Sequence, residues 1–234
     1  MTRSAELNQL IFNHLSAFIT EHKLKRFDEV LKNRTRYITV VIEDVYQPHN
    51  ASAVLRTCEC FGIQDVHIIE NQNTYTINPD IALGSAKWLS LFKYSGENNN
   101  TPTAIKLLKE KGYRIIATSP HSDNIVLEEL SLEKGPVAVM FGTEMRGLTQ
   151  TSFQLADEFI KIPMFGFTES FNISVSAALV LYHLTDKLRK STIDWELTEN
   201  DMIDIRLQWA REVVKRSDLI ERDFLSKNPL GKEE

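Results

Sequence analysis

Two short polar side chains, Ser170 and Asn172, stand between an apolar turn and a long apolar run with helical spacing. The turn, residues 162–172, also contains a proline, a glycine and phenylalanines, whereas a connection that only joins two elements is usually shorter and more polar. Apolar side chains kept in a turn predict a wall for a flat, mostly apolar ligand. At a helix entrance, free backbone N–H groups and short polar side chains can bind the polar part of such a ligand.

A second group of polar residues follows the first predicted strand. The loop after this strand offers His49 and Asn50, and Arg56 lies six residues beyond Asn50 on the predicted helix. Helical spacing turns Arg56 away from Asn50 but leaves both near the same edge of the sheet. Asn50 taken alone is explained as a helix cap. Arg56, among apolar neighbours, is typical either of a half-exposed filler or of a clamp for phosphate or carboxylate.

A third group lies between residues 141 and 149, where Gly142 and Gly147 bracket Glu144 and Arg146. Two glycines at this spacing indicate a backbone that bends sharply or approaches a ligand closely, although a tight strand-to-helix turn explains the pattern equally well. The loop lacks the Gly-Lys-Ser/Thr ending of a P-loop, and the chain contains no GxGxxG motif.

Other chemistries are disfavoured by spacing. The six histidines show no metal-ligand spacing, so we predict no metal site. The serines lack the G-x-S-x-G setting of a hydrolase nucleophile. Cys58 and Cys60 stand one residue apart inside a predicted helix, which suits neither a disulfide nor a zinc site and indicates reduced thiols.

The elements that must position these residues alternate along the chain. Two helical stripes fill residues 4–31, residues 85–92 are ambiguous, and no internal repeat is present. Strands are expected at 37–43, 66–69, 113–118, 137–141 and 159–162, and later helices at 51–61, 101–111, 149–156, 171–189 and 198–215. Such alternation predicts an α/β protein with a largely parallel sheet. Ligands of these sheets bind beyond the carboxyl ends of the strands, where all three polar groups fall.

Composition sets the broad class. The chain has 234 residues, 42% of them hydrophobic and 25% charged, which is ordinary for a globular protein with one substantial core. No run reaches the roughly 18–20 apolar residues of a membrane span, and the N-terminus lacks the apolar core of a secretory signal. We therefore expect a cytoplasmic protein without membrane contact.

Charge gives a mixed indication about nucleic acid. A net charge of −5 and a pI near 5.8 argue against indiscriminate nucleic-acid binding. Basic residues nevertheless outnumber acidic ones between residues 21 and 36, and a second basic cluster occupies 187–190. Each cluster is either a solvated helix face or part of a surface that binds RNA phosphates.

Taken in order, the three polar groups resemble the motifs of the SpoU (SPOUT) family of RNA 2′-O-ribose methyltransferases. The motifs read Asn50-x-x-Ala53-x-x-Arg56-x-x-x-x-Phe61-Gly62, Gly142-Thr-Glu144-x-x-Gly147-Leu, and Ile162-Pro-Met164 followed by Ser170-x-Asn172-x-Ser-Val-Ser. The N-terminal helices and the Trp209-Ala-Arg211 segment look like the flanks of the tRNA (guanosine-18 2′-O) methyltransferase subgroup.

The resemblance implies a SPOUT-type knotted parallel sheet flanked by helices, with N- and C-terminal helical extensions. It also implies a homodimer, S-adenosylmethionine as methyl donor, and 2′-O-methylation of a ribose in tRNA, at guanosine 18 of the D-loop. The expected domains are an RNA-binding extension at 1–36, a methyltransferase domain at 37–190 and a C-terminal extension at 191–234. Methylation of ribosomal RNA or of another tRNA nucleotide, and a non-catalytic RNA-binding module, are the alternatives.

The same resemblance assigns roles residue by residue. The cofactor pocket falls at Thr118, Gly142, Ile162, Met164 and Phe171, and the catalytic positions at Asn50, Arg56, Glu144, Ser170 and Asn172. RNA contacts are expected from Lys23, Arg26, Arg34, His49, Lys187 and Arg189. The third motif departs from the family pattern: Phe167 and Phe171 change the shape of the apolar wall, and Glu169 adds a negative charge near the RNA site.

Overall fold

The computed structural model describes residues 4–75, 84–119, 125–143 and 146–228. They form two compact units. One unit runs from Thr35 to Trp195, and the other combines the residues up to Arg34 with those from Glu196 onward. In the described part of the chain, no helix has the length and apolar character that crossing a membrane requires.

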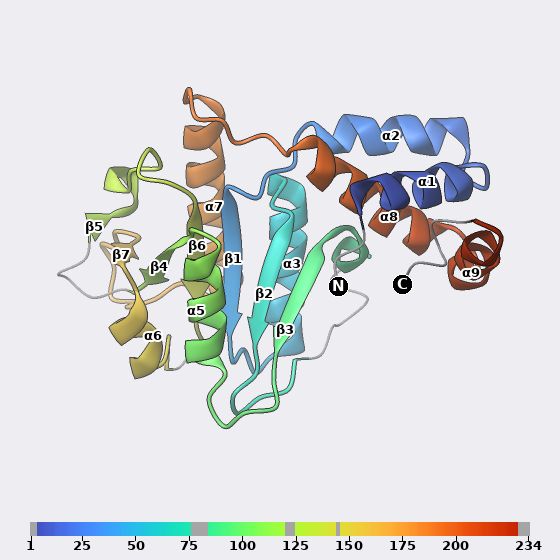
Figure 1. The fold of residues 1–234 in the computed structure, drawn as a ribbon. Helices are drawn as coiled ribbons and strands as arrows, with labels where there is room; N and C mark the ends of the chain where they lie inside the picture. The colour runs from blue at the N-terminus through green and yellow to red at the C-terminus, as the bar shows by residue number, and fades with distance from the viewer. Residues whose placement is uncertain (1–3, 76–83, 120–124, 144–145, 229–234) are drawn as a thin grey trace. The chain divides into compact units, whose positions relative to one another are not determined.

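The first unit is built on a seven-stranded sheet in which every pair of neighbouring strands is parallel (Figure 1). The strands are β1 (Ile38–Glu43), β2 (Asp65–Ile69), β3 (Ser90–Tyr94), β4 (Arg114–Thr118), β5 (Ile125–Val126), β6 (Val137–Phe141) and β7 (Glu158–Lys161). Their order is β3-β2-β1-β6-β4-β7-β5. Two late strands are thus inserted between earlier ones: β6 lies between β1 and β4, and β7 between β4 and β5.

Helices cover both faces of this sheet. One face packs against α3 (Pro48–Phe61) and α7 (Ile173–Arg189), and the other against α5 (Thr101–Glu110) and α6 (Gln150–Leu155). Two 3-10 turns, η1 (Ser85–Trp88) and η2 (Leu127–Glu129), complete the unit. Because both faces are covered, every residue of β1 and β6 is buried, which explains why these strands read as nearly continuous apolar runs.

The second unit is helical. It contains α1 (Ala5–Ser16), α2 (Glu21–Leu31), α8 (Glu199–Val213) and α9 (Ser217–Lys227). An apolar cluster joins Leu7, Ile11 and Leu15 of α1 to Leu207 and Ala210 of α8. The expected start of α8 is confirmed, because Thr198 and Asp201 form a reciprocal capping box.

Several boundaries differ from the expectations. Helix α3 begins at Pro48, whose fixed φ suits the first helical position, so Gln47 is the N-cap and Asn50 lies inside the first turn. The interpretation of Asn50 as a cap is therefore wrong. Helix α5 begins at Thr101, as expected, and ends at Glu110, one residue before the expected end. Strand β5, with two residues, and helix α9 were not predicted, and residues 85–92 form η1 and most of β3.

Candidate active site

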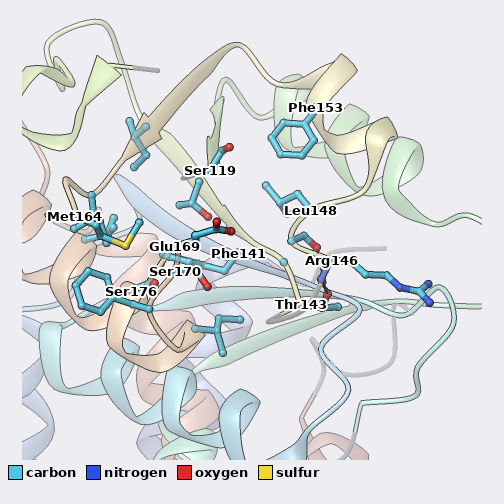
Figure 2. A pocket seen from close by; sticks show the side chains of 18 residues that line it. Ser119, Phe141, Thr143, Arg146, Leu148, Phe153, Met164, Glu169, Ser170 and Ser176 are labelled. Atoms are coloured by element: carbon cyan, nitrogen blue, oxygen red, sulfur yellow. Dashed lines mark hydrogen bonds between the residues drawn. The ribbon is translucent and has the colours of Figure 1, made fainter. Parts of the chain in front are cut away.

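A cavity of about 320 Å³ lies at the carboxyl ends of three adjacent strands, β4, β6 and β7 (Figure 2). The segments that follow these strands supply most of its lining, and the start of α7 supplies the rest. Five residues expected to bind the cofactor and one expected catalytic residue line it: Thr118, Gly142, Ile162, Met164, Phe171 and Ser170. Thr118 and Phe171, which are 53 positions apart in the chain, therefore line the same cavity.

The loop after β6, residues 142–148 and called here the glycine loop, lines the cavity with its described residues, 142, 143 and 146–148. The backbone N–H of Thr143 donates to the carbonyl of Gly147 at 3.0 Å, and the reverse bond measures 2.9 Å. A Cβ at position 142 would overlap the backbone of Gly147 and Leu148, and Gly147 itself has a φ of +66°. Both glycines are thus required by geometry, which confirms the expected sharp bend.

The cavity is mainly apolar. Side chains of Phe141, Leu148, Phe153, Ile160 and Val180 line it beside those already named. Ile162, Met164 and Phe171 of the 162–172 turn belong to this wall, as predicted. Phe167 is fully exposed and does not line the cavity, so the prediction that Phe167 changes the shape of the wall is wrong. The Thr118 hydroxyl donates to the Met140 carbonyl at 2.8 Å, and this hydrogen bond connects the end of β4 to β6.

Two charged residues, Arg146 and Glu169, are among the lining residues. Both are exposed. In Figure 2 the guanidinium of Arg146 extends away from the cavity. Glu169, the negative charge by which the third motif departs from the family pattern, lies on the cavity that this motif helps to form.

Two predicted catalytic residues meet beside the cavity. The Asn172 side-chain amide donates to Asn50 Oδ1 at 3.2 Å, although 122 positions separate them. Asn172 is also the N-cap of α7, where its Oδ1 accepts from the Ser174 backbone N–H at 2.9 Å. Asn50 is buried, and its own amide donates to Gln47. The hydrogen bond joins the first motif to the third and holds both amides in defined orientations.

Arg56 lies on α3, and its side chain is exposed. It forms no hydrogen bond with any residue that the structure describes. Glu144, another predicted catalytic residue, lies outside the described residues. The roles predicted for these two residues therefore stay predictions.

The residues expected to contact RNA differ in their surroundings. Arg34 is 1% exposed, and its guanidinium lies over the Trp209 ring at 5.6 Å from the centroid. The prediction that Arg34 contacts RNA phosphates is therefore wrong, because packing against an aromatic ring removes it from the surface. Lys187 donates to the carbonyls of Glu128 and Leu130, and Arg189 donates to that of Phe61.

The remaining three are more accessible. Lys23 is half-buried on α2, Arg26 is exposed on the same helix, where it pairs with Glu29, and His49 is exposed at the start of α3. These three keep their predicted role as candidates for phosphate contacts.

Sequence reasoning missed two buried carboxylates at the end of β1. Glu43 accepts four hydrogen bonds from Thr101, Thr149 and Ser152. Asp44, with a φ of +56°, accepts three from the backbone of residues 71–73. The available indication was an acidic pair at the end of a buried strand, with Glu43 as its last residue and Asp44 directly after it. Among the described residues, no group of His, Cys, Asp and Glu is arranged to hold a metal ion.

Comparison with known proteins gives consistent matches. The model of the SpoU rRNA methylase family matches residues 37–182. The tRNA (guanosine(18)-2′-O)-methyltransferase of Borreliella burgdorferi is 47% identical over 207 residues, covering 88% of this chain and 93% of that protein.

Solved structures match as well. The TrmH/SpoU tRNA modifying enzyme of Aquifex aeolicus superposes with a TM-score of 0.73 at 29% identity, over 83% of this chain and 98% of that one. The methyltransferase AviRb of Streptomyces viridochromogenes, solved in complex with AdoMet, shares the fold, with a TM-score of 0.58 at 18% identity over 70% of this chain and 62% of that one.

Proposed function

The chain belongs to the SpoU methylase family, and from this premise we propose that it methylates the 2′-hydroxyl of guanosine 18 in tRNA with S-adenosylmethionine as donor. One observation carries the proposal: the second and third motif loops line one apolar cavity at the sheet edge where such folds bind ligands, and the Asn172–Asn50 hydrogen bond joins the first motif to the third. The high identity to a relative named for this reaction supports the choice of substrate.

The cavity fits the proposed donor. Gly142 and Gly147 of the glycine loop line the cavity with backbone rather than with side chains, and apolar side chains offer a surface for an adenine ring. Thr118, Gly142, Ile162, Met164 and Phe171 would hold the donor. When bound, it supplies an activated methyl group: a C–O bond forms as the C–S bond breaks, and the hydroxyl proton leaves to solvent.

Arg56 would act on the RNA. A guanidinium remains protonated at neutral pH, so it is poorly suited to act as a base. Instead it would bind the phosphate next to the target ribose and stabilise negative charge developing on the 2′-oxygen. Its exposure and its lack of a hydrogen-bond partner within the described residues leave it available for this contact. Glu144 would orient it.

Asn172 and Ser170 would fix the ribose hydroxyl. The Asn172 amide is already oriented by Asn50 and by the start of α7, and Ser170 lines the cavity itself. Holding the hydroxyl in line with the donor supplies several kcal/mol of the rate enhancement by positioning alone.

We also infer a homodimer and a knotted chain, as the family resemblance implies. Val175, Leu179 and Tyr182 form an exposed apolar stripe on α7, with residue exposures of 43%, 40% and 62%. An exposed stripe of this kind is typical of a protein interface, and a second copy of the chain is the proposed occupant. Residues 1–36 would bind tRNA, together with the C-terminal extension at 191–234, and the protein would act in the cytoplasm.

The substitution Arg56→Ala tests the proposed mechanism. We expect S-adenosylmethionine affinity, measured by calorimetry, to stay within about twofold, because Arg56 does not line the cavity. Methylation of tRNA should fall by two or more orders of magnitude, as when other charge-stabilising groups are removed. Lys106→Ala removes another exposed cation, outside both basic clusters, and is the matched control. Parallel loss of binding and activity would show that Arg56 builds the pocket instead.

The substrate is tested by mass spectrometry of RNA nucleosides from cells that lack the protein. Loss of 2′-O-methylguanosine at tRNA position 18 is the expected result. Loss at a different tRNA position or in ribosomal RNA would redirect the proposal to that substrate. Unchanged methylation everywhere would favour a non-catalytic RNA-binding module.

A further inference from the structure

Glu43 is a buried carboxylate that the proposed chemistry does not use. It ends β1, is 1% exposed and forms no ion pair with any residue in the described part of the chain. The hydroxyls of Thr101, Ser152 and Thr149 donate to it at 2.5, 2.7 and 2.8 Å, and the backbone N–H of Thr149 donates at 2.8 Å. A buried carboxylate is tolerated only where donors satisfy it, so this arrangement is specific.

The donors belong to the starts of two helices. Thr101 is the first residue of α5, and Thr149 is the N-cap of α6, where its hydroxyl accepts from the Ser152 backbone N–H. Thr149 also follows directly on Leu148, the last residue of the glycine loop. Glu43 therefore anchors one end of the glycine loop to the central sheet, while the paired backbones of Thr143 and Gly147 close the other.

We propose that Glu43 is a positioning residue for the cofactor cavity: by holding Thr149 it keeps the glycine loop in the conformation that binds the donor. Glu43 is not among the residues that line the cavity, so it would act through Thr149. The inference rests on the proposed function, because the ligand it refers to is S-adenosylmethionine. By this proposal the affinity for S-adenosylmethionine depends on Glu43 as well as on the residues of the three motifs.

The neighbouring carboxylate offers a matched control. Asp44 is also buried, at 8% exposure, and its Oδ1 accepts from the backbone N–H groups of residues 71–73 at 2.8–3.0 Å. That segment contributes nothing to the cavity lining. Glu43→Gln and Asp44→Asn each remove one buried negative charge with little change of volume. Asparagine also tolerates the positive φ at position 44.

The experiment compares the two variants by calorimetric titration with S-adenosylmethionine, by thermal unfolding and by hydrogen exchange of the ligand-free protein. Glu43→Gln should weaken the affinity for S-adenosylmethionine about tenfold, as expected when a buried hydrogen bond to a charged group is lost. It should also speed hydrogen exchange in residues 142–149. Asp44→Asn should leave affinity within about twofold and speed exchange in residues 71–75 instead. Affinity for tRNA should be the same in both.

Equal loss of donor affinity in both variants, in proportion to their loss of thermal stability, would overturn the inference. If Glu43→Gln does not fold, Thr149→Val removes one of the donors to Glu43 and should show the same exchange pattern. Failure of the unaltered protein to bind S-adenosylmethionine would instead refute the proposed function. In that case unchanged exchange of the glycine loop in Glu43→Gln would still refute the role of Glu43.

Discussion

At the scale of single residues, Gly142 illustrates how a missing side chain shapes the cavity. Its Cα faces the backbone of Gly147 and Leu148 so closely that no other residue fits without moving the glycine loop. Glycine is needed here for close approach, whereas Gly147 is needed for its positive φ.

We expect Gly142→Ala to weaken S-adenosylmethionine binding about tenfold or more, because the inserted methyl group displaces the cavity wall. Gly166→Ala is the matched control: it lies between the cavity-lining residues Met164 and Glu169, and the nearest atom to its Cβ would be 4.0 Å away. Calorimetry measures both affinities. Comparable affinities in the two variants would show that the loop adapts and that the close approach is dispensable.

A second residue-scale effect concerns His67, which is buried on β2 with its ring stacked on Phe92 and within 2.8 Å of the Tyr94 hydroxyl. Burial, with a smaller contribution from nearby Lys111, lowers the pKa of His67 from 6.5 to about 4. As the pH falls below 6.5, His67 becomes protonated in the unfolded chain, whereas in the folded chain it stays neutral until about pH 4. Stability is therefore lost across this window as the pH falls.

The expected loss between pH 7 and pH 5 is about 2 kcal/mol, since each pKa unit corresponds to about 1.4 kcal/mol. His67→Gln should lack this part of the pH dependence, while the carboxylates of both proteins titrate alike. Urea unfolding at the two pH values measures the difference. Equal losses in the two proteins would mean that His67 does not carry the effect.

At the scale of elements, α7 has three different surfaces. Its buried side packs on the sheet with α3, its first turns line the cavity, and a stripe from Val175 to Tyr182 stays exposed. Apolar residues at helical spacing usually indicate only a core-facing side. The exposed stripe is therefore the part of this helix that an association with a second copy would explain.

Leu179→Glu should convert the proposed dimer into a monomer, because a charge would have to be buried without a partner. Lys190→Glu, at the exposed end of the same helix, should leave the dimer intact. Light scattering coupled to size exclusion measures the mass of each variant. A monomeric unaltered protein would refute the homodimer outright.

At the scale of the whole molecule, the two units carry different chemistry. The sheet unit contains the cavity and both asparagines of the site. The helical unit contains Lys23 and Arg26 on α2, among the candidate contacts to RNA phosphates. The net charge of −5 means that any attraction to tRNA must come from local patches of this kind.

Reversing both charges, with Lys23→Glu and Arg26→Glu, should weaken tRNA binding and reduce the slope of log affinity against log salt by about two. Donor affinity should not change. The same reversal at Lys106 and Lys109 on α5 is the control. An unaltered salt slope in the α2 variant would identify this patch as a solvated helix face.

Local pattern was enough to predict the α/β class, most of the strands and helices, and the expectation that chemistry lies at the carboxyl ends of the strands. These properties depend on residues close together in the chain, such as the β-branched run of β1 or the apolar spacing of α7. The sharp bend at the two glycines of the glycine loop was predicted for the same reason. Elements with few residues, such as β5, carried too little pattern to be found.

Only the tertiary structure decided features that join distant positions. The insertion of β6 between β1 and β4, the meeting of Asn50 with Asn172, and the burial of Arg34 under Trp209 each depend on contacts across about 100 residues or more. The donors around Glu43 likewise come from helices far along the chain. Local propensity does not encode such contacts, because packing and hydrogen-bond satisfaction select them among many arrangements compatible with the same elements.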